Sequence, residues 1–137
     1  MFDTTTEFGS RAARRLRDEK IIWLTSVRSD GLPQPVPVWF LWENETFLIY
    51  TQPQAQKLRN INHNPKVSLH FDGGKWGDDI VIFTGEAFID DNAPMVDQKS
   101  EYVEKYREGL RRINLSPEKM ARDYSVAIRV RLTRLLG

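Results

Sequence analysis

Short apolar segments separated by turn residues constrain the fold of this sequence more than any other feature. Runs rich in Val, Ile, Phe and Trp, bounded by Gly, Pro, Asn and Asp, are typical of strands joined by hairpins. Two helical insertions interrupt the series, so we expect a mainly β protein, a closed or partly closed antiparallel barrel with peripheral helices. The six expected strands are Ile21–Val27, Val36–Trp42, Thr46–Thr51, Lys66–Phe71, Ile80–Asp91 and Ser125–Leu136.

Helices are expected at four places around this barrel. Proline lacks an N–H and restricts its predecessor, so the second helix must stop at His63–Pro65. Ser116 and Pro117 are suited to be the N-cap and first residue of the last helix, and Gly85 indicates a bulge or bend within the fifth strand. The expected helices are Glu7–Glu19, Gln56–Asn62, Met95–Ile113 and a short one within Ser116–Tyr124.

Length and composition favour one domain, residues 1–137. The chain lacks cysteine, a signal-like N-terminus and any run near the ~20 apolar residues of a membrane span, so we expect a cytoplasmic protein. A net charge of +1 argues against a general nucleic-acid surface. Basic residues still gather in the first helix and the last strand, where they are either solvated charges or attract an acidic ligand.

Side chains able to catalyse a reaction by themselves are scarce. The two histidines, His63 and His70, fall in a turn and a strand, so a metal centre would lack ligands. The carboxylate pairs Asp78–Asp79 and Asp90–Asp91 stand beside turns, which indicates solvated loop ends. We therefore expect neither a catalytic side chain nor a metal site. An enzyme whose chemistry belongs to a bound cofactor needs only binding, orientation and electrostatics from the protein.

The segment Phe47–Phe71 is the best candidate binding site, because it reads as a strand, a loop, a short helix and a strand. The first turn of a helix presents free backbone N–H groups and the positive end of the helix dipole, so Lys57 and Arg59 there would favour a phosphate. Neutral hydrogen bonds to that phosphate are expected from Thr51 and Gln56, and Asn60 lies one helical turn from Lys57 on the same face. The alternative is that the two cations are simply solvated on a surface helix.

Prolines alternate with other residues in the segment Pro35–Trp39, which leaves that strand without ladder donors on one side. The strand is either an edge blunted against aggregation or a place where a flat ligand lies against exposed backbone. Trp39, Phe40 and Trp42 could belong to the core, a dimer wall or a stacking surface. One barrel interior cannot bury both faces of the apolar second and third strands, so we expect dimerisation through the barrel wall.

The loop Gly73–Gly77 carries one cation, Lys75, and one large aromatic side chain, Trp76. At the rim of a barrel such a loop could close on a ring system, with Trp76 stacking and Lys75 meeting an anion. The alternative is a plain hairpin turn with an exposed tryptophan.

The order of these motifs resembles a known family. A PVWF strand at residues 37–40, a KLRN helix turn at 57–60 and an HNP stop at 63–65 are together similar to the pyridoxamine-phosphate-oxidase-like split-barrel flavoproteins, and more narrowly to their small deazaflavin-dependent oxidoreductase branch. The resemblance runs from about Arg14 to Asp90 and resumes in the last strand. It implies a six-stranded antiparallel split β-barrel of the FMN-binding type. It also implies a homodimer with two cofactors in grooves at the subunit interface.

The resemblance further implies which residues contact the cofactor. Lys57 would hold the phosphate with Thr51, Gln56 and Asn60 near it, and the ring would lie against the backbone of Val36, Pro37, Val38 and Trp39. The partner subunit would supply the other wall of the groove, for which Lys75, Trp76 and Arg129 are the candidates. In the narrower branch the cofactor is coenzyme F420, whose reduced form passes a hydride to an electron-poor acceptor such as an enone, a quinone or a tetrapyrrole.

Two departures from the family pattern bear on the function. The pyridoxamine phosphate oxidases proper carry an Arg/Ser-Arg-Lys-type phosphate grip and C-terminal substrate residues, whereas this chain has QAQK at 54–57 and LLG at its end. These departures argue against vitamin B6 oxidation, and the resemblance to the deazaflavin branch implies an F420-dependent oxidoreductase. The alternatives are an FMN-binding oxidase or flavin reductase, and a barrel that binds a flavin or haem without turnover.

Overall fold

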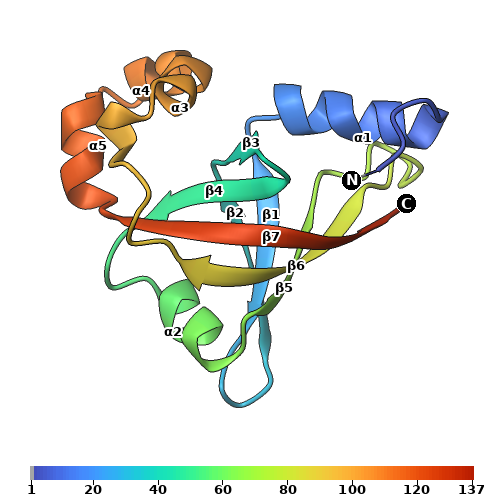
Figure 1. Ribbon diagram of the computed structural model, residues 1–137, viewed down its shortest axis with the longest axis horizontal. Coiled ribbons are helices and arrows are strands. Elements are labelled where there is room, and N and C mark those ends of the chain that lie inside the picture. Colours follow the sequence, from blue (N-terminus) through green and yellow to red (C-terminus); the bar gives the residue numbers. More distant parts are fainter. Residues whose placement is uncertain (1) are drawn as a thin grey trace.

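The computed structural model describes residues 2–137 as a curled antiparallel sheet with helices around it (Figure 1). Neighbouring strands follow the order β2-β1-β5-β6-β7-β4-β3. The strands are β1 (Ile22–Val27), β2 (Pro33–Val38), β3 (Leu41–Glu43), β4 (Thr46–Thr51), β5 (Lys66–His70), β6 (Ile82–Ile89) and β7 (Val126–Leu136). The expected mainly β barrel with peripheral helices is confirmed, with seven strands in place of six.

The extra strand arises because the prediction of one strand over Val36–Trp42 is wrong. The chain pairs β2 with β1, leaves the sheet at Trp39 and Phe40, and then pairs β3 with β4. These consecutive strands are the two edges of the sheet, at opposite ends of its strand order. An uninterrupted apolar run carries no sign of such a change of partner, so the sequence alone did not reveal it.

The short connection between β2 and β3 forces the sheet to curl. Three Cα–Cα steps from Val38 to Leu41 span at most about 11 Å. The edges of a flat seven-stranded sheet would lie about 29 Å apart at the usual strand spacing. The sheet therefore bends until its two edges approach each other, which gives a split barrel.

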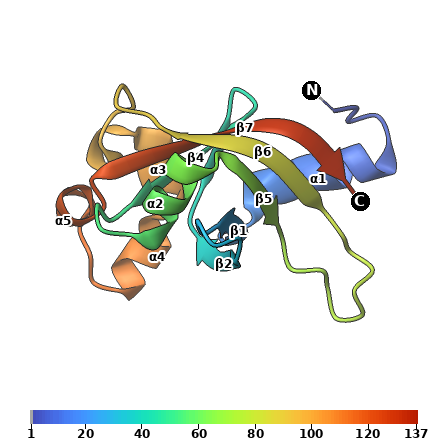
Figure 2. The same ribbon diagram turned by 90° about the horizontal axis from the view of Figure 1, so that it is seen from below.

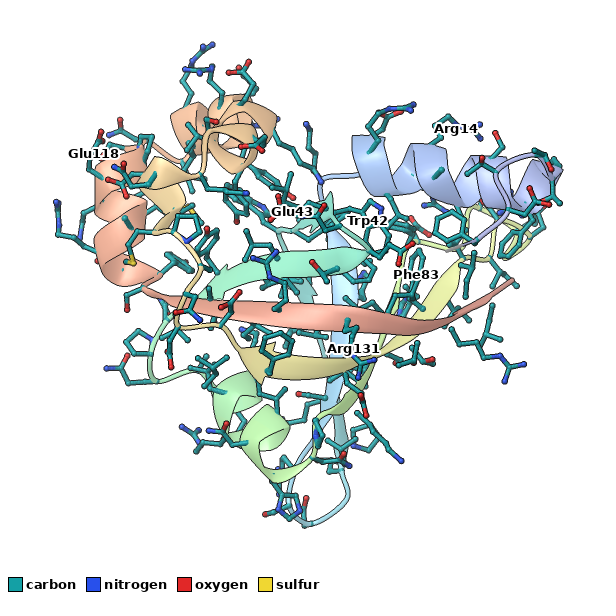
Figure 3. The ribbon with its side chains drawn as sticks, in the orientation of Figure 1. Arg14, Trp42, Glu43, Phe83, Glu118 and Arg131 are labelled. Atoms are coloured by element: carbon teal, nitrogen blue, oxygen red, sulfur yellow. The ribbon has the colours of Figure 1, made fainter. Side chains whose placement is uncertain are left out.

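Aromatic side chains fill the inside of the curl. Phe47 packs edge-on against Trp42 and Phe83, with ring centroids 4.8 and 5.2 Å away. Trp42 and Phe83 approach each other below helix α1 (Glu7–Asp18) (Figure 3). Phe40 is fully buried and lies 5.9 Å from Phe71. Phe40 is thus a core residue, and Trp42 packs against the core.

Helices gather at two ends of the sheet (Figure 2). Helix α1 lies at one end with the β5–β6 loop, to which Arg11 Nη1 is tied through Asp79 Oδ1 at 2.6 Å. Helix α2 (Gln56–His63) and the helices that follow β6 lie at the other end. None of the helices within residues 2–137 is long and apolar enough to cross a membrane.

The prediction of one continuous helix over Met95–Ile113 is wrong. The segment forms η1 (Val96–Gln98), α3 (Ser100–Lys105) and α4 (Arg107–Arg112), followed by α5 (Pro117–Asp123). The break between α3 and α4 is at Tyr106, which has φ −107° and ψ 13°. Its buried hydroxyl donates to Lys20 O at 2.8 Å and accepts from Phe40 N–H at 2.8 Å. The break coincides with a residue anchored to two distant segments, a constraint that helical periodicity does not report.

Several local predictions are confirmed. Helix α2 ends before Pro65, and the Ser116 hydroxyl caps α5 by accepting from Lys119 N–H at 3.1 Å. The β6–β7 register shifts at Gly85, as expected for a bulge. A Cβ atom at Gly85 would lie 2.6 Å from Arg131 O, so only glycine fits there without movement.

Candidate functional site

Lys57 is a half-buried cation at the start of α2. It is the second residue of α2, and its Nζ donates to Thr51 Oγ1 at the end of β4 over 3.1 Å. Among residues 2–137 no carboxylate lies within ion-pair distance of it, and burial alone lowers the pKa of Lys57 below its usual 10.5. The first turn of α2 carries the positive end of the helix dipole, and its Leu58 N–H bonds Ala55 O at 3.1 Å. The position therefore favours an anion.

A chain of amide groups fixes α2 against β1 and β2. Gln56 Nε2 donates to Asn60 Oδ1 at 2.9 Å, and Asn60 Nδ2 donates to Ser26 Oγ and Gln34 Oε1, each at 2.9 Å. Asn60 is buried and uses both ends of its amide in these bonds. In this arrangement Asn60 positions the helix, while the exposed Gln56 stands at its first turn.

Two hollows meet at Lys57. The first, here called the β2–α2 hollow, has a volume of about 370 Å³ and lies between the edge strand and the helix. The second, here called the tyrosine cavity, has a volume of about 230 Å³ and lies between the end of β2 and helices α3 and α5. The predicted residues that line one or both are Val36, Pro37, Val38, Trp39, Thr51, Gln56, Lys57 and Asn60. The structure thus brings eight of the predicted site residues together.

Strand β2 is an exposed edge, and its prolines share one face. Pro33, Pro35 and Pro37 are exposed, whereas Gln34 and Val36 are half-buried on the opposite face and Val38 is buried. A proline has no N–H to give to a ladder, so this edge presents backbone carbonyls but few donors. Both interpretations of the strand are compatible with this position: an edge protected against aggregation by its prolines, and a backbone surface that a flat ligand contacts.

Trp39 connects the strand to the tyrosine cavity. Its ring stacks on that of Tyr106 with centroids 4.4 Å apart and planes 4° from parallel. A Cβ atom at Gly109 would lie 3.2 Å from the Trp39 ring, so the indole is held closely from the α4 side. Trp39 therefore stacks on its own chain while it lines the cavity.

Three predicted residues lie away from this site within the chain. Lys75 and Trp76 are in the β5–β6 loop at the α1 end, where the Lys75 ammonium lies 5.4 Å from the centroid of the Trp76 ring and Trp76 is 81% exposed. Arg129 on β7 is paired with Glu43 at 2.9 Å and Asp90 at 3.3 Å. Their contacts with a cofactor stay predictions, and Lys75 and Trp76 would have to reach it from another subunit.

The sequence did not predict the tyrosines of the cavity. Tyr50, Tyr102 and Tyr124 line it from β4, α3 and the end of α5. The only available signal was the apolar stripe of the segment 95–113, which identifies a buried face but not what it encloses. Burial raises the pKa of Tyr50 to about 12 and that of Tyr102 well above its ordinary value. The phenols of Tyr50 and Tyr102 thus stay protonated at neutral pH.

The fold and the site together define a class of protein. It is a split barrel in which a half-buried cation stands beside an edge strand and two hollows. The sequence matches the pyridoxamine 5'-phosphate oxidase family over residues 9–136, and the chain belongs to this family. Among curated proteins none matches the sequence.

Solved structures share the fold along nearly the whole chain. A conserved hypothetical protein from Mycobacterium tuberculosis matches with a TM-score of 0.73, 20% identity and coverage of 95% of this chain and 82% of its own. An F420 reductase matches with a TM-score of 0.61, 24% identity and coverage of 90% and 94%. The haem storage protein HutZ from Vibrio cholerae matches with a TM-score of 0.62, 16% identity and coverage of 90% of both chains. At these identities the likeness concerns the fold.

Proposed function

We propose that the protein is an F420-dependent oxidoreductase that transfers a hydride between reduced deazaflavin and an electron-poor organic acceptor. The observation that carries the proposal is the half-buried Lys57 at the first turn of α2, which forms no ion pair within residues 2–137. A cofactor phosphate would replace the missing counter-charge. The similarity to an F420 reductase supports the choice of cofactor.

The roles of the chain's residues follow from this placement. Lys57 binds the phosphate with Thr51 beside it, and the amide chain through Asn60 holds the helix in position. The backbone of β2 from Val36 to Trp39 supports one side of the ring. The bound cofactor supplies the hydride, so the protein needs to bind, orient and exclude water.

We also propose a cytoplasmic homodimer in which the partner subunit closes the groove. Trp23 on the outer face of β1 is 37% exposed and stacks on His70, with centroids 6.5 Å apart. The neighbouring outward residues of β2 are the exposed prolines. This face, with an exposed indole beside prolines, supports dimerisation through the barrel wall, with Lys75, Trp76 and Arg129 as candidate contacts across the groove.

The test is a parallel titration of purified protein with F420, FMN and haem, followed by turnover with quinone and enone acceptors. Protein from a host without F420 should be colourless and should bind F420 more tightly than FMN. A yellow protein with bound FMN would instead favour the oxidase or flavin reductase. Binding of haem or flavin without reduction of any acceptor would favour a storage protein. Gel filtration with light scattering measures the expected dimer.

A further inference from the structure

Gly109 lies inside α4 at the point where the Trp39 indole packs against that helix. Its φ is not positive, so the backbone there does not require glycine, and glycine is unfavourable inside a helix. A Cβ atom at Gly109 would lie 3.2 Å from both Cζ2 and Cη2 of Trp39. Carbon atoms in contact prefer a separation of roughly 3.5–4.0 Å. The missing side chain therefore leaves room for the indole.

The Trp39 indole stands between Tyr106 and the tyrosine cavity. One face of this half-buried ring stacks on Tyr106, which is itself buried. Trp39 lines the cavity, whereas Tyr106 and Gly109 do not. The Tyr106 hydroxyl is bonded to Lys20 O and to the N–H of Phe40, so its ring has little freedom to move. Pressure on the indole from α4 is therefore relieved towards the cavity.

The volume of the cavity limits the ring that it can hold. Its lining is mainly aromatic and aliphatic, with Lys57 as its one charged residue within residues 2–137. The volume of about 230 Å³ is below the roughly 300–1,000 Å³ of drug-sized sites. At the packing density of protein interiors the contents would fill about 170 Å³ of it. This space suits one or two fused rings, and the four linked rings of a tetrapyrrole exceed it.

We propose that the acceptor is a planar molecule of one or two fused rings that binds in the tyrosine cavity, and that Trp39 sets this size limit. The inference rests on the proposed function and narrows its acceptors to small quinones and enones. Lys57 lines both hollows, so a ring in this cavity lies next to the hollow in which the cofactor is proposed to bind. Trp39 determines specificity by its size, and Gly109 positions it.

The binding test compares Gly109→Ala with wild type and with Arg112→Ala. Arg112 is an exposed residue of the same helix and lines neither hollow, so it is the matched control. Calorimetric titrations of cofactor-free protein use 1,4-naphthoquinone, the three-ring 9,10-phenanthrenequinone and the tetrapyrrole biliverdin. Wild type and Arg112→Ala should bind naphthoquinone most tightly. In Gly109→Ala the displaced indole narrows the cavity, so naphthoquinone binding should weaken by at least about fivefold.

A double substitution tests whether this effect passes through the indole. The Trp39→Phe variant lacks Cζ2 and Cη2, the two atoms that a Cβ at Gly109 would meet. It should bind phenanthrenequinone more tightly than wild type does, because the cavity is wider. Adding Gly109→Ala to Trp39→Phe should cause no further loss of naphthoquinone affinity. An equal loss in both backgrounds would overturn the role of Trp39.

The outcomes separate this inference from the proposed function. A wild type that binds phenanthrenequinone or biliverdin as tightly as naphthoquinone overturns the inference, and so does one that binds none of the three. Equal naphthoquinone affinity of Gly109→Ala and Arg112→Ala overturns it as well. A parallel titration of wild type with F420 tests the cofactor. Failure to bind F420 with the size preference intact rejects the proposed function and leaves the size limit of the cavity in place.

Thermal unfolding shows where the added methyl group of Gly109→Ala is accommodated. Alanine favours a helix more than glycine does, and an indole that moves into open space relieves the contact. The variant without ligand should therefore melt at the wild-type temperature or above it. A clear fall in the melting temperature would show that the indole cannot move towards the cavity, and would overturn the proposal.

Discussion

Substitution of Lys57 by Met should have opposite effects on stability and on cofactor binding. The side chain keeps its length but loses a charge that is half-buried and unpaired among residues 2–137. One charge-assisted bond to a phosphate contributes about 1.5–3 kcal/mol, so the cofactor Kd should rise by roughly 10- to 150-fold. The free energy of unfolding without cofactor should stay the same or increase, since the desolvated charge is gone.

The pH dependence of the free energy of unfolding tests the same desolvated charge of Lys57. Burial lowers the pKa of Lys57 in the folded protein below its usual 10.5, so the unfolded chain binds more protons between the two values. Wild-type stability should therefore rise with pH across that alkaline window, and the contribution should be absent from Lys57→Met. Urea unfolding of both proteins at several pH values measures this difference.

The assay for binding is titration with F420 or FMN, whichever the wild type binds. Lys66→Met is the matched control, because Lys66 is an exposed lysine at the start of β5, just after α2. Its affinity should stay close to wild type. If Lys57→Met bound the cofactor as tightly as Lys66→Met does, the assignment of the phosphate to α2 would be refuted.

Three further predictions concern the fold around the site. Gly85→Ala should lower the free energy of unfolding by about 1–3 kcal/mol, because its Cβ would lie 2.6 Å from Arg131 O; a wild-type urea midpoint would contradict this. Phe83→Ala should cost about 3–5 kcal/mol in the same measurement, since the ring is fully buried among other rings, and a loss below 1 kcal/mol would show a loosely packed interior. Burial lowers the pKa of Lys105 to about 8, so the unfolded chain binds more protons than the folded one above that pH. Wild-type stability relative to Lys105→Met should therefore rise from pH 8 towards 10, and a constant difference would contradict the burial of this ammonium.

Much of the fold was predictable because it depends on local signals. The strand Thr46–Thr51, the end of α2 before Pro65 and the cap at Ser116 all follow from turn residues, proline and side-chain capping. The break between β2 and β3 and the break at Tyr106 depend on partners far along the chain. Such long-range contacts leave no periodic signal in the sequence.

The candidate site divides in the same way. Lys57 and its neighbours in the 51–60 segment were predictable, because a loop that leads into a helix places them together. The cavity behind them was not, since Tyr102 and Tyr124 reach it from helices more than 40 positions away from that segment. The cofactor contact expected of Lys75 and Trp76 stays a prediction, because it requires a second subunit and the structure holds one chain.

The two-residue connection at Trp39 and Phe40 has a consequence for how this chain can vary in length. Loops at a protein surface usually tolerate insertions well. This connection is different, because it sets how closely the two sheet edges approach and carries the indole that stacks on Tyr106. An added residue there would loosen the curl and reshape both hollows at once. Length changes compatible with the site therefore belong in turns that carry none of its residues, whereas this link must keep its present length.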